Sequence, residues 1–140
     1  MGSLTISNVT KTFGSTEVLK GINIDIADGE FLILVGPSGC GKSTLMNTIA
    51  GLEEVTTGQL LLAGEDVTER SPKDRDIAMV FQSYALYPTM NVARNISFGL
   101  EMRGVPKQER DQRVQEVSTL VQINHLLDRK PSQLSGGQRQ

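Results

Sequence analysis

Several features of other protein classes are scarce or absent in this sequence. A single cysteine, Cys40, cannot form an internal disulfide, which favours a reducing compartment. The longest aliphatic runs, such as FLILV and LLLA, are far shorter than the ~20 residues that span a bilayer. The first residues, MGSLTISNV, lack the charged and apolar regions of a secretory signal. We therefore expect a cytoplasmic protein, which only a partner would hold at a membrane.

Excess positive charge is also lacking. The chain has fourteen Lys and Arg residues and sixteen Asp and Glu residues, for a net charge of -2. No clustered basic face is present to neutralise phosphates along a nucleic acid, so DNA and RNA are not expected as partners. The 140 residues, 38% of them apolar, are enough for one folded domain with its own core.

The N-terminal half of the chain has the patterns of strands. Alternating apolar and polar residues predict half-exposed strands at 4–13 and 18–26, and the continuous run FLILV predicts a strand at 31–35 that is buried on both faces. Helical spacing then predicts a helix at 42–50, ended by Gly51. Two further apolar runs, at 58–64 and 77–81, are plausible strands.

The C-terminal half changes to a helical period. Residues 91–104 and 106–123 are predicted to be helices, and Pro106 suits the start of the second. One face of that helix carries the apolar residues Val114, Val117, Leu120 and Val121. The only histidine, His125, is interpreted as a residue at a helix end or on the surface.

Between the predicted strand at 31–35 and the predicted helix lies GPSGCGKS, which fits G-x-x-x-x-G-K-[ST]. Glycines at 36, 39 and 41 let successive backbone N–H groups turn inward toward a phosphate, and the helix N-terminus adds its positive end. Lys42 would bring a charge to the β and γ phosphates, and the Ser43 hydroxyl suits Mg²⁺. Cys40 needs only its backbone N–H. The predicted nucleotide site comprises Gly36, Pro37, Ser38, Gly39, Cys40, Gly41, Lys42, Ser43 and Thr44.

Two further motifs lie downstream of the phosphate loop. VFQ at 80–82 and LSGGQ at 134–138 follow GPSGCGKST, and together the three resemble the ATP-binding-cassette (ABC) transporter ATPases. The segment FQSYALYPTMNVARNISFGL is similar to the corresponding sequence in the ATPase subunits of bacterial carbohydrate and glycerol-phosphate importers. The resemblance implies an α/β P-loop NTPase core with an N-terminal antiparallel β portion and a helical subdomain. It implies an ATPase that uses ATP and Mg²⁺ and couples their use to uptake of a small solute.

The resemblance also assigns roles to single residues. Phe13 matches an aromatic that stacks on adenine, although it could be a core residue instead. Gln82 matches a glutamine that touches Mg²⁺ and the attacking water, although it could be a simple strand-edge residue. Lys42 and Gln82 are thus the candidate catalytic residues, and Ser43 and Gln82 the candidate metal ligands.

In the family LSGGQ acts on a second subunit, which meets the first head to tail. The resemblance implies that Ser135, Gly136, Gly137 and Gln138 close over the γ-phosphate held by that partner. Taken alone, Ser-Gly-Gly is an ordinary helix start. The family's catalytic glutamate and switch histidine follow the signature and are absent here. We therefore expect the first part of a longer ATPase, able to bind Mg-ATP but poor at hydrolysis.

The expected division is a β portion and P-loop core at 1–87, a helical subdomain at 88–133 and the start of the signature helix at 134–140. The parallel core should be incomplete, with exposed apolar edges. Two other functions stay open. The chain could be an interaction fragment that docks on a membrane permease through Tyr84, Tyr87 and Pro88, or an ABC ATPase that is unrelated to transport.

Overall fold

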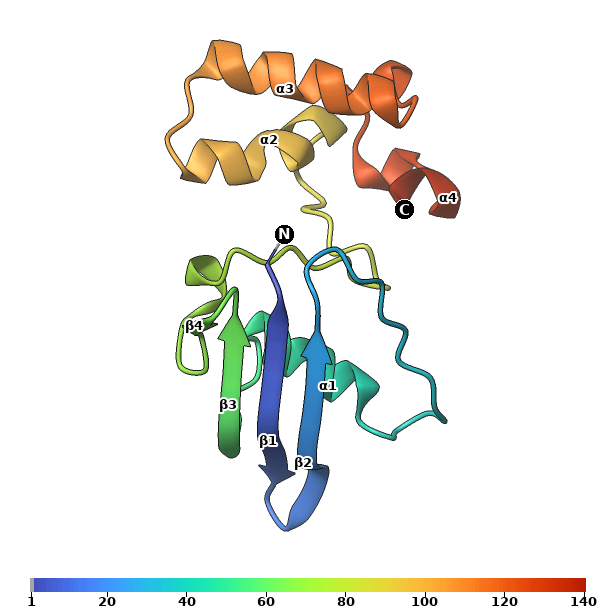
Figure 1. Cartoon of the computed structure of the whole chain (residues 1–140). Coiled ribbons are helices and arrows are strands. Elements are labelled where there is room, and N and C mark those ends of the chain that lie inside the picture. The colour runs from blue at the N-terminus through green and yellow to red at the C-terminus, as the bar shows by residue number, and fades with distance from the viewer. Residues whose placement is uncertain (1) are drawn as a thin grey trace. The chain divides into compact units, whose positions relative to one another are not determined.

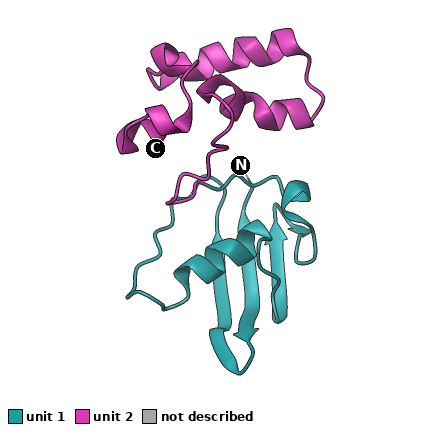
Figure 2. Cartoon of the chain, turned by 180° about the vertical axis from the view of Figure 1, so that it is seen from behind, with its two compact units in different colours: residues 1–79 teal, residues 80–140 magenta. Residues whose placement is uncertain are grey.

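The computed structural model describes residues 2–140 and divides them into two compact units. The first unit is Met1–Met79 and the second is Val80–Gln140 (Figure 2). The first is a sheet with one α-helix, and the second is helical. The sequence predicts a division after residue 87, whereas the units divide between Met79 and Val80.

The first unit contains a four-stranded antiparallel sheet in the order β2-β1-β3-β4 (Figure 1). Its strands are β1 (Leu4–Phe13), β2 (Thr16–Ile26), β3 (Thr57–Leu62) and β4 (Glu65–Asp66). In the central strand β1, Ile6 lies opposite Ile24 of β2 and Leu60 of β3. The alternation of apolar and polar residues therefore places one set of side chains on one face, as the sequence predicts.

Helix α1 (Lys42–Ala50) packs its apolar side on this sheet. Leu45 of α1 joins a buried cluster with Ile6, Val9, Leu19, Leu60 and Val67. Gly51 ends α1 in the left-handed conformation, at φ 77°, and its N–H caps the carbonyl oxygens of Asn47 and Thr48. A short 3₁₀ turn at Pro72–Asp74 follows β4. The core of the unit thus lies between the sheet and the helix that follows the phosphate loop.

Two strand predictions were wrong. Residues 31–35 and 77–81 form no strand, and the side chains of Phe31, Val35 and Val80 are 87%, 89% and 80% exposed. A strand satisfies its backbone groups only by pairing with a neighbour, and no strand in the described residues pairs with either run. The apolar composition of each run is therefore insufficient to make it a strand.

The second unit is built on two helices, α2 (Val92–Met102) and α3 (Lys107–Leu120), as predicted. Asn91 caps α2, since its side-chain oxygen accepts a hydrogen bond from the backbone N–H of Arg94 at 2.9 Å. Of the apolar face predicted on α3, only Val114 is buried, and Leu120 is 82% exposed.

Short turns complete the second unit. 3₁₀ turns at Asn124–Leu126 and Pro131–Gln133 lead to the short helix α4 (Gly136–Arg139). His125 lies exposed in the first of these turns, as its surface interpretation predicts. Among residues 2–140, no helix has both the length and the apolar character to cross a membrane.

Candidate nucleotide site

The glycine-rich loop at 36–41 leads directly into the N-terminus of α1. Gly39 and Gly41 have φ angles of 81° and 95°, in the left-handed region that side chains disfavour. Gly41 is also crowded, because an added Cβ would lie 3.1 Å from Leu19 Cδ2 and 3.2 Å from the Val18 carbonyl oxygen. The loop therefore needs glycine at position 41 for its conformation and for its approach to β2.

Lys42 folds back over the loop. Its Nζ atom donates to the carbonyl oxygens of Gly36 and Pro37, each at 2.7 Å, and lies 3.3 Å from Cys40 Sγ. An ammonium group has three N–H donors, so these contacts use all of them. The cation is thus held at the mouth of the loop, and a phosphate would have to replace these contacts.

Ser43 and Thr44 occupy the first turn of α1. Ser43 is exposed, and the first turn contains no acidic residue that would repel an anion. The orphan N–H groups and the helix dipole at this end favour negative charge. A hydroxyl oxygen beside bound phosphate oxygens is the kind of ligand that Mg²⁺ prefers, so the residues present fit this ion.

Phe13 ends β1 and is 45% exposed. The Nζ atom of Lys11 lies 4.8 Å from the centroid of its ring, close enough for a cation–π contact. Lys11 is in turn fixed by the carbonyl oxygen of Glu54 at 2.6 Å and by the Glu53 carboxylate at 3.2 Å. Phe13 is therefore an exposed ring and not a core aromatic.

In the second unit, Gln82 is exposed and precedes a loop that α2 holds in place. The Asn95 side chain accepts a hydrogen bond from Tyr87 N at 2.8 Å and donates to the carbonyl oxygens of Tyr87, Met90 and Asn91 at 3.0 to 3.2 Å. The ring of Tyr87 also contacts that of Phe98, at 4.6 Å between centroids. Tyr87 nevertheless remains 46% exposed.

The signature segment LSGGQ is anchored at its first residue and exposed beyond it. Leu134 is buried, whereas residues 135–140 are exposed. Ser135 caps α4 by accepting from Gln138 N at 3.3 Å, and Gln138 Oε1 accepts from Ser135 N at 2.9 Å. An added Cβ at Gly136 would lie 3.5 Å from the Tyr84 hydroxyl, which places this hydroxyl beside the signature.

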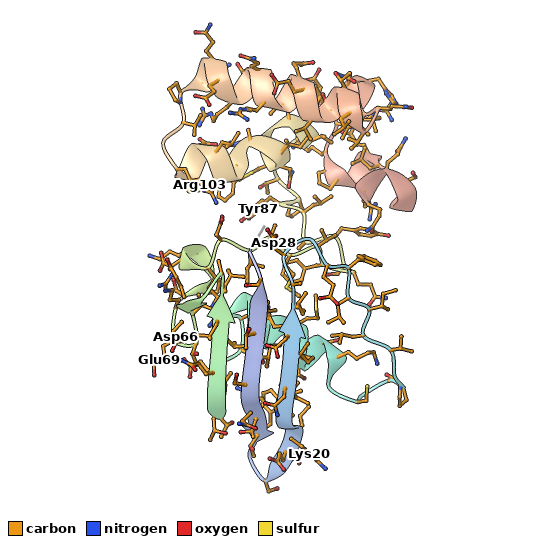
Figure 3. The ribbon with its side chains drawn as sticks, in the orientation of Figure 1. Lys20, Asp28, Asp66, Glu69, Tyr87 and Arg103 are labelled. Atoms are coloured by element: carbon orange, nitrogen blue, oxygen red, sulfur yellow. The ribbon has the colours of Figure 1, made fainter. Side chains whose placement is uncertain are left out.

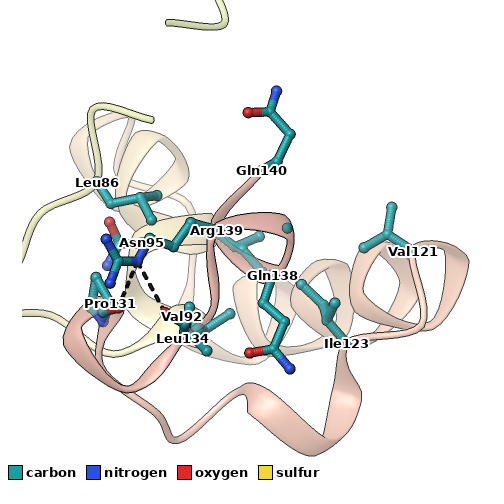
Figure 4. A pocket seen from close by; sticks show the side chains of 12 residues that line it. Leu86, Val92, Asn95, Val121, Ile123, Pro131, Leu134, Gln138, Arg139 and Gln140 are labelled. Atoms are coloured by element: carbon teal, nitrogen blue, oxygen red, sulfur yellow. Dashed lines mark hydrogen bonds between the residues drawn. The ribbon is translucent and has the colours of Figure 1, made fainter. Parts of the chain in front are cut away.

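Arg139 closes the segment, as its Nε donates to the carbonyl oxygens of Pro131 at 3.1 Å and Leu134 at 3.2 Å (Figure 4). An adjoining pocket of about 330 Å³ is lined mainly by apolar side chains, among them Leu86, Val92, Ile96, Ile123 and Leu134. The second unit thus presents the exposed signature next to an apolar hollow, which the sequence did not predict.

Sequence reasoning also missed Arg75 and Asp66 in the first unit. Arg75 is 3% exposed, and burial lowers the pKa of its guanidinium from the ordinary value. Asp66, at the edge of the sheet (Figure 3), has its pKa lowered to about 2, because its carboxylate accepts hydrogen bonds from Thr68 and Gln59. Neither residue stands out in the sequence, where charged residues are usually solvated.

A glycine-rich loop that opens a helix and carries Lys42 and Ser43 defines a P-loop nucleotide-binding protein. Comparison gives the family: the profile described as "ABC transporter" matches residues 19–140, and the chain belongs to that family. The α/β fold agrees, since a structure described as a dimeric bacterial ABC transporter cassette superposes with a TM-score of 0.87 and 32% identity. That match covers 97% of this chain and 65% of the other.

Curated relatives are more similar to this chain in sequence than that structure is. The maltose/maltodextrin import ATP-binding protein MalK of Yersinia pestis bv. Antiqua is 56% identical over the whole chain. The sn-glycerol-3-phosphate import ATP-binding protein UgpC of Rhodopseudomonas palustris is 54% identical. This chain spans 38% and 39% of the lengths of these two proteins. In sequence the chain is thus similar to the ATP-binding proteins of a maltose/maltodextrin importer and of a glycerol-phosphate importer.

Proposed function

We propose that the chain binds Mg-ATP as part of the ATP-binding subunit of an importer, and that the parent subunit couples ATP binding and hydrolysis to uptake of a sugar or glycerol-phosphate. The observation that carries this proposal is the geometry of the phosphate loop. Two left-handed glycines turn the backbone into the N-terminus of α1, with Lys42 held at its mouth. The solute class is that of the two importer relatives, a maltose/maltodextrin importer and a glycerol-phosphate importer.

Each predicted residue has a role in this proposal. Phe13 stacks on the adenine, the backbone N–H groups of 36–44 bind the phosphates, and Lys42 exchanges its loop carbonyls for phosphate oxygens. Ser43 and Gln82 contribute oxygen ligands to the metal. Bound Mg²⁺ supplies positive charge that offsets the charge developing during phosphoryl transfer.

The partners follow from the exposed segments of the second unit. Ser135, Gly136, Gly137 and Gln138 would close on nucleotide held by a second ATPase subunit, which requires the exposure they have here. A membrane permease would hold the pair at the cytoplasmic face. The 140 residues alone would hydrolyse Mg-ATP at background rate, because the family's water-positioning carboxylate follows the signature.

A calorimetric titration of Mg-ATP into the 140-residue chain tests the site, with Lys42→Ala as the comparison. We expect saturable binding that is lost or greatly weakened in the variant, since the loop would lose its point charge. A parallel assay of phosphate release should show no turnover above background. Equal binding by both proteins would refute the site, and Mg-dependent turnover abolished by Lys42→Ala would refute the hydrolysis deficit.

A second candidate function is docking on a permease without chemistry. The observation that favours it is the loop 83–90, which the Asn95 side chain fixes by three hydrogen bonds while the rings of Tyr84 and Tyr87 stay exposed. Exposed aromatic rings on a rigid loop are typical of a docking surface, since little conformational freedom is lost on binding.

Binding of the chain to the detergent-solubilised permease, by surface plasmon resonance, tests this candidate. Tyr87→Ala should weaken binding, whereas Met102→Ala should not, although Met102 is an apolar side chain that is 66% exposed in the same unit. Unchanged binding of the Tyr87 variant would remove this function and leave nucleotide binding unaffected.

A further inference from the structure

Arg75 is a buried cation whose hydrogen-bond partners are all backbone carbonyl oxygens. Nε donates to Arg70 O at 2.8 Å, and Nη2 donates to Thr68 O at 2.9 Å. Nη1 donates to Thr48 O at 2.8 Å and to Ile49 O at 2.9 Å. Removing a charge from water is costly unless the charge is well hydrogen-bonded, and these four bonds offset that cost. They also tie the guanidinium firmly to the segments that carry the carbonyls.

Two of these four carbonyls belong to the last turn of α1. The last carbonyls of a helix have no partner within it, and this end carries the negative pole of the helix dipole. The last turn of α1 contains no basic residue of its own. Gly51 N–H already donates to Thr48 O, so Arg75 adds, from a different segment, a second donor to Thr48 O, a donor to Ile49 O and the cation that this helix end lacks.

Gly51 makes room for the guanidinium. An added Cβ at this position would lie 2.6 Å from Arg75 Nε and 2.8 Å from Cζ. Gly51 thus serves twice, because it ends α1 in a left-handed conformation and lets Arg75 reach the helix carbonyls. The pair joins the C-terminal end of α1 to the segment at 68–75.

The opposite end of α1 is the phosphate site. The helix has only nine residues, about 14 Å at 1.5 Å per residue, and its N-cap residue Gly41 provides no side-chain cap. A short helix moves as one rod, so an anchor at one end also sets the position of the other. Arg75 cannot itself touch a nucleotide at the N-terminal end.

We propose that Arg75 is a positioning residue of the nucleotide site, which fixes α1 from its C-terminal end and thereby holds Lys42 and Ser43 where they meet the phosphates. This inference rests on the proposed nucleotide binding and names a residue that none of the motifs contains. The contribution comes through α1 and not through contact with the ligand.

The test compares Arg75→Met, Arg75→Lys and Gly51→Ala with wild type, by Mg-ATP calorimetry well below the unfolding temperature. Arg70→Met is the matched control, since it makes the same change of charge five residues away, at an exposed side chain that pairs with Glu65 on the surface. We expect Arg75→Met to weaken binding about tenfold, the equivalent of one charge-assisted hydrogen bond. Arg75→Lys and Gly51→Ala should weaken it less, and Arg70→Met should leave it unchanged.

Amide hydrogen exchange separates positioning from general stability. In Arg75→Met, residues 45–51 should exchange at least about tenfold faster while β1 and β3 keep their wild-type protection. If Arg75→Met does not fold, the same comparison applies to Arg75→Lys.

Two results would overturn the proposal. One is an unchanged dissociation constant in the Arg75 variants, and the other is faster exchange spread evenly over α1 and the sheet, as a merely structural residue would cause. If wild type and Arg70→Met also fail to bind Mg-ATP, the nucleotide site itself is refuted. Binding by wild type and by Arg75→Met with equal affinity refutes only the role of Arg75.

Discussion

Gly39 and Gly41 form a matched pair with which the geometry of the phosphate loop can be tested. Both have left-handed φ angles, at 81° and 95°, and they lie two residues apart in the same loop. They differ in their surroundings. A Cβ at Gly39 would meet nothing within 4 Å, whereas a Cβ at Gly41 would lie 3.1 Å from Leu19 Cδ2 and 3.2 Å from Val18 O.

The expected losses of folding stability follow from the left-handed backbone conformation and from the crowding around the added Cβ. Alanine in a left-handed conformation costs about 1–2 kcal/mol, and both variants incur this cost. Gly41→Ala adds overpacking against β2, which costs about 1–3 kcal/mol, and the backbone carbonyl there cannot rotate away as a side chain can. The effect of each alanine on the unfolded chain is the same and cancels in the comparison.

Urea unfolding of the two variants provides the measurement. Gly41→Ala should have the lower free energy of unfolding, by about 1–3 kcal/mol relative to Gly39→Ala, with unchanged denaturant dependence. Equal losses would show that the approach of the loop to β2 is not a real constraint. A greater loss in Gly39→Ala would contradict the reasoning directly.

Two further predictions concern Leu60 and Asp66 of the first unit, with Leu120 of the second unit as a control. Leu60→Ala should lower the free energy of unfolding by about 2–5 kcal/mol in urea, because Leu60 is fully buried, whereas Leu120→Ala, at a residue that is 82% exposed, should change it little. Asp66→Asn should be less stable than wild type at pH 7. Since the folded pKa of Asp66 is about 2 and its ordinary value is 3.8, this difference should shrink as the pH falls from about 4 to 2. A difference that stays constant across this range in pH-dependent unfolding would show that the Asp66 carboxylate does not contribute through its charge.

Local patterns predicted those parts of the chain whose structure depends on near neighbours in sequence. The helices at 42–50, 92–102 and 107–120 form where the helical spacing indicated, and Gly51 ends the first of them. The phosphate loop could also be predicted from the sequence, because the glycines, lysine and serine that form it recur at a fixed spacing.

Strands at 31–35 and 77–81 could not be decided in this way. Their composition favours buried strands, but a strand exists only with a partner that satisfies its backbone, and pairing is a property of the tertiary structure. Strands β1, β2 and β3 form because each finds such a partner among the others.

The sequence by itself determined the family, the phosphate loop and the signature segment, because these depend on residue types at short spacing. Only the tertiary structure decided the roles of Arg75 and Asn95, since each binds carbonyl groups brought to it by the fold. A buried arginine and an exposed one look alike in sequence. What distinguishes them is the set of backbone carbonyl oxygens that folding gathers around the side chain.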